Sequence, residues 1–293
     1  MINRALAPDT PAAAAAQAVD SPALRWAAGN VSAARERLVV EEPLSIEIAY
    51  ERAGQAVTRL LSVTMRTPGE DPELALGFLY GEGLVDRADD VVGGELLGEN
   101  ARGEKIPTWR ARLARPPRSQ AVERVSRGII TSAACGLCGR TSLEGLRLRA
   151  PADPSIAPAM PGEAVLALPG ALRAHQRIYP QTGGCHGAGL FDAAGEPIAV
   201  REDVGRHNAV DKVVGAALQS GAAMAGATLV LSGRAGFELI QKAAAAGVAL
   251  AVAVGAPSSF AVRLAGDAGI TLVGFARDGR FNIYSHAGRQ IVG

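Results

Sequence analysis

The spacing of apolar residues differs between the two halves of the chain. In the first half, apolar and polar residues alternate in places between residues 38 and 65, most clearly in the segment Leu44-Ser-Ile46-Glu-Ile48-Ala-Tyr50. A period of two is typical of half-buried antiparallel strands. The pattern therefore predicts such strands here. Further strands are expected at 108–113 and 121–130, with a proline-containing turn at 115–119 between them.

A helix is expected to begin at residue 71. The sequence Asp71-Pro72-Glu73 combines a side chain that can cap a helix, a proline suited to the first turn and an acid that favours the positive end of a helix. The apolar face of this helix would contain Leu74, Phe78 and Leu79.

From about residue 162 the chain contains short apolar runs without alternation, which is the pattern of strands buried on both faces. Strand-like runs occupy 228–231, 248–254 and 270–275, and helix-like stretches lie near 209–219, 237–246 and 260–268. Their alternation predicts an α/β (α+β) fold, with a C-terminal α/β layer over a mixed sheet after a smaller β-rich domain.

The predicted organisation has three parts. Residues 1–30, which are rich in alanine and interrupted by prolines, are expected to be a disordered tail. Residues 31–130 would form the small β-rich domain and residues 131–293 the α/β domain. The stretch 151–161, which contains four prolines, is expected to be a linker or surface loop.

Two uncharged runs, 213–233 and 243–262, are long enough to raise the question of membrane spans. Polar residues and glycines interrupt the first, and Pro257 with two serines interrupts the second. The N-terminus also lacks the continuous apolar stretch of a secretory signal. We therefore expect a soluble, cytoplasmic protein with no membrane partner.

Composition and charge exclude several classes of protein. Of the 293 residues, 48% are apolar, which argues against disorder over most of the chain. Lysine and arginine total 30 against 29 acidic residues, so the basic excess of a protein that coats nucleic acid is absent. Three cysteines are too few for a disulfide scaffold and fit a reducing compartment.

Two of the three cysteines form a CxxC motif, Cys135-Gly-Leu-Cys138, within a glycine-rich segment. Thiols at this spacing can lie on one turn, and a lowered pKa would make the reactive thiolate available near neutral pH. The residues alone leave three active hypotheses open: a thiol–disulfide oxidoreductase, half of a zinc site, and a cysteine that carries sulfur as a persulfide. A chance motif without function is the fourth.

Other candidate sites lie in the second half of the chain. A glycine-rich run, 182–189, contains Cys185 and His186, and a polar run, 201–208, contains His207; either segment can instead be a tight turn or a solvated helix start. Two loops follow predicted strands, Ser232-Gly-Arg234 and Phe275-Ala-Arg277-Asp-Gly-Arg280. Ligands of open α/β sheets bind beyond the carboxyl ends of strands, where these arginines would meet phosphate oxygens.

Taken together and in order, these segments resemble the FdhD-type formate dehydrogenase accessory sulfurtransferases. The resemblance covers about residues 36–285. It rests on Met65-Arg-Thr-Pro68-Gly, Leu74-Ala-Leu-Gly77-Phe, Cys135 with Cys138, Thr182-Gly-Gly with His186, Glu202-Asp203-Val-Gly205-Arg206-His207-Asn208, Asp211-Lys212, Ser232-Gly-Arg234 and Val273-Gly-Phe275.

The resemblance implies a function. Members of this family accept sulfur from a cysteine desulfurase as a cysteine persulfide and deliver it to the molybdenum of bis(molybdopterin guanine dinucleotide), which formate dehydrogenase requires. By position, Cys135 would carry the persulfide and Cys138 would assist. Two alternatives remain: a chaperone that binds the molybdenum cofactor without transferring sulfur, and a CxxC protein with a zinc or thiol-redox function.

The resemblance also implies a fold and a binding site. The C-terminal domain would be similar to cytidine deaminases, although the His-x-Glu zinc signature is absent and no tightly bound metal is expected. Family members tend to form homodimers. The implied cofactor-binding residues, at which GDP or GMP can also bind, are Phe275, Ala276, Arg277, Asp278, Gly279, Arg280, Arg234, His186 and His207. The role of Cys185 is unassigned.

Overall fold

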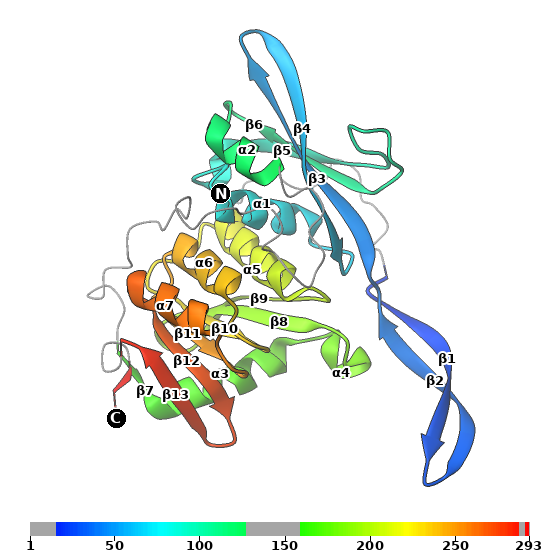
Figure 1. Cartoon of the computed structure of the whole chain (residues 1–293), viewed down its shortest axis with the longest axis vertical. Coiled ribbons are helices and arrows are strands. Elements are labelled where there is room, and N and C mark those ends of the chain that lie inside the picture. The colour runs from blue at the N-terminus through cyan, green and yellow to red at the C-terminus, as the bar shows by residue number, and fades with distance from the viewer. Residues whose placement is uncertain (1–15, 127–158, 287–290, 293) are drawn as a thin grey trace.

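A computed structural model of the chain describes residues 16–126, 159–286 and 291–292. Two sheets with their helices form the body, and a long hairpin extends away from it (Figure 1). The hairpin is β1 (Ala18–Ala27) and β2 (Asn30–Val39). The small sheet contains β3 (Glu42–Arg52), β4 (Gln55–Arg66), β5 (Val91–Leu97) and β6 (Thr108–Leu113). The large sheet contains β8 (His186–Phe191), β9 (Pro197–Asp203), β10 (Thr228–Leu231), β11 (Leu250–Ala253), β12 (Thr271–Arg277) and β13 (Arg280–Ser285).

The helices are α1 (Asp71–Gly81), α2 (Ser119–Ser126), α3 (Gly162–His175), α4 (Tyr179–Thr182), α5 (Arg206–Ser220), α6 (Phe237–Ala246) and α7 (Ser259–Asp267). A short 3₁₀ turn, η2 (Ala88–Asp90), precedes β5. The short strands β7 (Met160–Pro161) and β14 (Ile291–Val292) pair with each other.

The small sheet has the strand order β4-β3-β6-β5, and it confirms the strands predicted within 38–65 and at 108–113. The expected half-burial is wrong for β3, in which residues 44–48 are all buried. One face packs on α1 and Trp109. On the other face, the Glu47 carboxylate accepts hydrogen bonds from the Arg110 side chain and from the backbone N–H of Ala101. The loop between β5 and β6 therefore buries the second face.

Helix α1 begins at Asp71 as predicted, but Asp71 does not cap it. The residue before the helix is Glu70, which has a left-handed φ of 53°, and no side chain caps the helix. The Asp71 carboxylate instead accepts two hydrogen bonds of 2.9 and 3.0 Å from the Arg66 guanidinium, and both side chains are nearly buried. This bidentate ion pair fixes the connection between β4 and α1.

The strand predicted at 121–130 is wrong, because residues 119–126 form helix α2 and residues 127–130 lie outside the described part of the chain. Ala121, Val122 and Val125 recur at helical rather than alternating spacing. Ala121 is buried in the main core, and the two valines pack against it. The predicted domain boundary at residue 130 also falls in the undescribed segment 127–158.

The disordered tail predicted at 1–30 is wrong for the strand β1 and the turn after it. β1 pairs with β2 in continuous antiparallel register from Ala18 opposite Val39 to Ala27 opposite Asn30. Ala28 and Gly29 form a two-residue turn in which both φ angles are positive, the geometry that suits tight hairpins. The sequence does not indicate this hairpin turn, because Ala28 stands at the first turn position, where asparagine or aspartate is usual. Residues 1–15 are outside the described part of the chain.

The large sheet is mixed, with the strand order β13-β12-β11-β10-β8-β9, which confirms the predicted α/β layer. Strands β10, β11 and β12 are parallel, while β8 and β13 run opposite to their neighbours. Helices α5, α6 and α7 cover one face, and α3 covers the other (Figure 1). The predicted strands and helices after residue 200 are all present, with small shifts of their ends.

Helices α1 and α5 join the small sheet to the large one through a close backbone contact. A Cβ atom added to Gly77 of α1 would lie 1.8 Å from the carbonyl oxygen of Asp211, and one added to Gly215 of α5 would lie 1.9 Å from that of Glu73. Side chains from both sheets and both helices belong to one hydrophobic cluster. The two predicted domains therefore share a continuous core.

No helix in the described part of the chain is long and apolar enough to cross a membrane. The uncharged run 213–233 is divided between α5 and β10, and the run 243–262 is divided among α6, β11 and α7. Most of their apolar residues are buried in the core.

Replacing either contact glycine should destabilise the fold. Gly77→Ala and Gly215→Ala each place a methyl group against backbone, so we expect each to lower the free energy of unfolding by about 1–3 kcal/mol. The matched control is Gly170→Ala in α3, where an added Cβ meets nothing within 4 Å. That change should be neutral or stabilising by up to about 1 kcal/mol. Denaturant unfolding measures the stability of all three variants. Equal stability of Gly77→Ala and Gly170→Ala would contradict the close contact.

Candidate functional site

One edge of the large sheet gathers the predicted site segments. Strands β9, β10, β11 and β12 all end at this edge, and β8 and β13 begin there, because they run in the opposite direction. The carboxyl edge of an open α/β sheet is where ligands usually bind. The loops after β10 and β12 and the start of α5 therefore lie where the sequence predicted.

A cluster of cationic side chains surrounds His186 at this edge. His186 begins β8, Arg206 and His207 are the first residues of α5, and Arg234 follows β10. Burial lowers the pKa of His186, and the neighbouring side chains of Arg206, His207 and Arg234 lower it further. The imidazole is therefore neutral near pH 7, between guanidinium groups. Such a cluster is suited to an anionic ligand.

Glycines let the loops at this edge approach one another closely. The backbone N–H of Gly255 donates to the carbonyl of Gly233 (2.9 Å), and the N–H of Phe275 donates to that of Gly255 (3.1 Å). A Cβ atom on Gly233 would lie 3.3 Å from Nδ1 of His186. This hydrogen-bonded row runs across β8, β10, β11 and β12. At a strand spacing of about 4.8 Å, it separates His186 from Phe275 by roughly 14 Å.

The segment from Phe275 to Arg280 ends β12, turns and begins β13. Phe275 interrupts the pairing with a left-handed φ of 53°, which is unusual for a bulky residue and costs conformational energy. Arg277 lies over its ring, with 5.7 Å between the guanidinium carbon and the ring centroid. The tip residues Asp278 and Gly279 are exposed, whereas Ala276 is fully buried in the core. The tip can therefore reach a ligand, but the Ala276 side chain cannot.

His207 is held in place by an acidic partner. Its Nε2 lies 2.7 Å from a carboxylate oxygen of Glu238, which is in the first turn of α6. Both side chains are mostly buried. The pair joins the starts of α5 and α6, so His207 keeps a fixed orientation next to His186.

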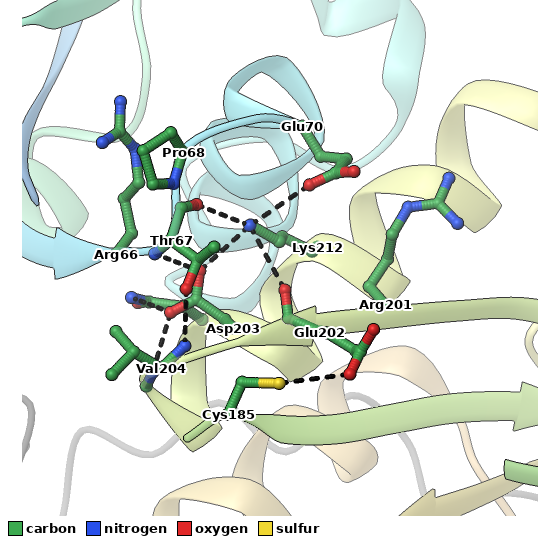
Figure 2. Close-up of polar contacts among 12 residues, drawn as sticks. Arg66, Thr67, Pro68, Glu70, Cys185, Arg201, Glu202, Asp203, Val204 and Lys212 are labelled. Atoms are coloured by element: carbon green, nitrogen blue, oxygen red, sulfur yellow. Dashed lines mark hydrogen bonds and ion pairs between the residues drawn. The ribbon is translucent and has the colours of Figure 1, made fainter. Parts of the chain in front are cut away.

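Asp203 of the polar run 201–208 and Lys212 of α5 are the centre of a buried network (Figure 2). This network ties the large sheet to the connection between β4 and α1. Lys212 is fully buried, and its Nζ lies 3.0 Å from Asp203 and 3.3 Å from Glu70 and donates to the carbonyl of Thr67 (2.9 Å). Asp203 also accepts from the backbone N–H of Thr67 (3.1 Å) and of Gly205 (2.8 Å). Burial raises the pKa of Asp203, and the Lys212 ammonium opposes that rise.

Glu202 organises a second buried centre. Its carboxylate accepts hydrogen bonds from three consecutive backbone N–H groups, which belong to Arg177, Ile178 and Tyr179. The thiol of Cys185 donates to the same carboxylate at 3.1 Å (Figure 2). Burial alone would raise the pKa of Glu202, but these donors outweigh burial and lower it. The carboxylate therefore holds α4 against β9.

Cys185 is consequently a structural cysteine. It is buried, and burial together with the Glu202 carboxylate strongly raises the pKa of its thiol. A thiol held protonated is a poor nucleophile. The third cysteine, which the sequence left unassigned, is thus a hydrogen-bond donor in the core.

Cys135 and Cys138 lie in the segment 127–158, outside the described part of the chain. Within the described ranges, no group of three or more His, Cys, Asp or Glu side chains is arranged to hold a metal ion.

The polar run 201–208 divides into two parts that sequence inspection does not separate. Glu202, Asp203 and Asn208 are buried and form structural hydrogen bonds, whereas Arg206 and His207 face the candidate site. Neither Arg206 nor Glu238 was among the site residues predicted from the sequence. Arg206 could have been found, because it directly precedes His207 at a predicted helix start; Glu238 could not, because its contact is made across two helices.

Comparison with known proteins shows which family the chain matches. The profile of the FdhD/NarQ family matches residues 39–291. The chain is 46% identical to the sulfur carrier protein FdhD of Mycolicibacterium paratuberculosis, covering 89% of this chain and 94% of that protein. It is also 46% identical to the sulfur carrier protein FdhD of Anaeromyxobacter dehalogenans, covering 89% and 90%. A crystal structure of a putative formate dehydrogenase accessory protein from Desulfotalea psychrophila has the same fold, with a TM-score of 0.69, 24% identity, and coverage of 94% of this chain and 99% of that one.

The Glu202 centre predicts a specific pH dependence. Because its pKa is lowered on folding, the carboxylate stabilises the protein above about pH 4.5, and this contribution is lost as the pH falls and Glu202 becomes protonated. Glu202→Gln should lower the free energy of unfolding at pH 7 by about 1–3 kcal/mol. Its free energy of unfolding should then decrease less than that of the wild type as the pH falls to 3.

The matched control is Glu196→Gln, which removes the same charge at an exposed position. Denaturant unfolding of the three proteins between pH 3 and pH 7 is the measurement. If the free energy of unfolding decreased by the same amount in the wild type and in Glu202→Gln as the pH falls, Glu202 would not be the cause of the pH dependence.

Proposed function

The chain belongs to the FdhD/NarQ family, and from this premise we propose that it is a sulfurtransferase for formate dehydrogenase. It accepts sulfur from a cysteine desulfurase as a persulfide on Cys135 and passes it to the molybdenum of bis(molybdopterin guanine dinucleotide), which is its substrate. Curated relatives named as sulfur carrier proteins, at 46% identity over most of both chains, support this role.

The first step is a thiol exchange. The Cys135 thiolate attacks the outer sulfur of the persulfide on the donor enzyme. A new S–S bond forms at Cys135, the S–S bond of the donor breaks, and the donor cysteine leaves as a thiolate. Cys135 then carries the sulfur. Among the cysteines only Cys185 is described, and its buried, hydrogen-bonded thiol is unsuited to this attack.

Release of the sulfur uses the second cysteine of the motif. The Cys138 thiolate attacks Sγ of Cys135, so that a Cys135–Cys138 disulfide forms and the outer sulfur leaves with the bonding electron pair as hydrosulfide. Hydrosulfide is a soft ligand suited to molybdenum. A cellular dithiol then reduces the disulfide and restores both thiols.

The cationic cluster at the sheet edge is the single observation that carries the binding half of the proposal. His186, Arg206 and Arg234 converge where glycine loops leave the backbone accessible. Arginine forks suit phosphate oxygens, and the nucleotide arms of the substrate contain diphosphates. The exposed tip at Arg277 to Arg280, roughly 14 Å along the same edge, would contact a more distant part of the same molecule.

A cofactor-binding chaperone without sulfur transfer is the second candidate function. The same cluster favours it, because none of the described residues that form the cluster is a cysteine. The two functions differ in whether maturation of formate dehydrogenase depends on Cys135 and Cys138.

Binding of GDP, which resembles the nucleotide arm of the substrate, should depend on the cluster. A charge-assisted hydrogen bond contributes about 1.5–3 kcal/mol, so Arg206→Gln and Arg234→Gln should each weaken GDP binding by about 10-fold or more. Calorimetric titration measures the affinity. The control, Arg59→Gln, removes the same charge from an exposed side chain on the small sheet and should bind normally. Unchanged affinity in both cluster variants would place GDP elsewhere.

Sulfur loading should depend on Cys135. After incubation with a cysteine desulfurase and cysteine, the wild type should gain the mass of one sulfur atom on the peptide that contains Cys135. Cys135→Ala should not gain it and should fail to mature formate dehydrogenase, while still binding GDP.

The matched control is Cys185→Ala, which removes a buried thiol and should load sulfur normally, with only a small loss of stability. Normal maturation of formate dehydrogenase by a Cys135→Ala/Cys138→Ala double variant would contradict sulfur transfer and would favour the chaperone.

A further inference from the structure

The position of His186 depends on how the chain enters β8. Two glycines, Gly183 and Gly184, follow α4 just before this strand. Gly183 has a left-handed φ of 64°, and a Cβ atom added to it would meet nothing within 4 Å. Its absent side chain therefore serves the backbone conformation. Gly184 does not have a positive φ, so a contact rather than the conformation makes a side chain unfavourable there.

That contact is with Val39, the last residue of β2. A Cβ atom on Gly184 would lie 2.7 Å from Cγ1 of Val39 and 3.4 Å from its Cβ. Carbon atoms pack at about 3.5–4.0 Å, so an added methyl group would overlap the valine. A β-branched side chain has few χ1 rotamers with which to avoid the overlap. The base of the hairpin formed by β1 and β2 therefore rests directly on the backbone before β8.

Val39 is itself held in place on the other side. The backbone N–H of the next residue, Val40, donates to the carbonyl of Gln17 (2.9 Å). The side-chain amide of Gln17 donates to the carbonyl of Pro68 (3.0 Å). Pro68 lies in the connection between β4 and α1, which the buried network of Figure 2 holds. Val39 is therefore a fixed stop for Gly184.

The residues on either side of His186 are also restrained. The thiol of the preceding residue, Cys185, donates to the Glu202 carboxylate. The backbone N–H of the following residue, Gly187, donates to Oγ of Ser232 (2.9 Å), and its carbonyl accepts from the Ser232 N–H (3.0 Å). The contact with the hairpin is a third restraint, and it acts two residues before the imidazole.

We propose that Val39 is a positioning residue for His186. By limiting where Gly184 lies, it sets the entry of the chain into β8 and holds the imidazole between Arg206 and Arg234. The inference rests on the proposed binding of a nucleotide at the cationic cluster. A group that contacts a ligand must be held to within about 0.5 Å, which requires support from surrounding residues. The hairpin thereby contributes to a site on the large sheet that is distant from it in sequence.

A double-mutant cycle on the full chain, measured by calorimetric titration with GDP, tests the proposal. Gly184→Ala should weaken GDP binding by about 10-fold or more, because the added methyl group displaces the start of β8. Val39→Ala should weaken it by about 3-fold, because it removes the stop. Val39→Ala/Gly184→Ala should bind GDP within about 3-fold of the wild type, since the new methyl group occupies the space that the valine leaves.

The imidazole gives a second readout, which does not require GDP and which a merely structural contact would not change. The chain has four histidines, and His186→Gln identifies the His186 resonance in an NMR pH titration. The chemical shift and the titration midpoint of His186 should change in Gly184→Ala. Both should return to the wild-type values in the double variant.

The matched controls are Gly98→Ala, where an added Cβ atom meets nothing within 4 Å, and Val57→Ala, which shortens a half-buried valine of β4. Both should leave the GDP affinity and the His186 resonance unchanged. Denaturant unfolding establishes that each variant is folded. If Gly184→Ala does not fold, Val39→Ala and the double variant decide by the same two measurements.

Three results would each overturn the positioning role. The first is a wild-type His186 resonance in Gly184→Ala, and the second is a wild-type GDP affinity in that variant. The third is a double variant that is not restored. A wild type that does not bind GDP would instead contradict the proposed function, and the His186 resonance would then decide the positioning role alone.

Discussion

The close contact between α1 and α5 is the constraint on which the rest of the structure depends. Gly77 and Gly215 remove the side chains that would hold the two helices apart, so that each helix rests on a carbonyl oxygen of the other. The buried Lys212 then reaches Asp203, Glu70 and the carbonyl of Thr67 at once. These contacts join a small sheet and a large sheet into one body, because a buried ammonium without its partners would be strongly destabilising.

This constraint also positions the candidate site. The helix whose middle packs on α1 begins with Arg206 and His207, so fixing α5 fixes these two side chains at the edge of the large sheet. Glu202 and Asp203, which end β9 just before this helix, are held by backbone N–H groups from α4 and from the connection between β4 and α1. The polar run 201–208 is therefore one continuous segment with two roles. Its acidic residues stabilise the fold, and Arg206 and His207 face the candidate site.

Much of the fold could be predicted from local pattern. The strands at 108–113 and 228–231 and the helix at 237–246 follow from periodicity alone, since a buried strand and an amphipathic helix have different repeats. Helix α2 and the hairpin β1–β2 were missed for opposite reasons. The short apolar set of α2 fits either repeat, and the turn of the hairpin lacks the residues that usually announce it. In both cases the local signal is weaker than the contacts that decide the structure.

By itself, the sequence determined the α/β class, the loops at the strand ends and the family resemblance, because these depend on residue type and order along the chain. Only the tertiary structure decided that Cys185 is a buried donor, that Glu202 and Asp203 are structural, and that Arg206 joins His186 and Arg234. Those roles depend on burial and on partners distant in sequence. A side chain's pKa and accessibility are set by such neighbours, which a linear pattern does not contain.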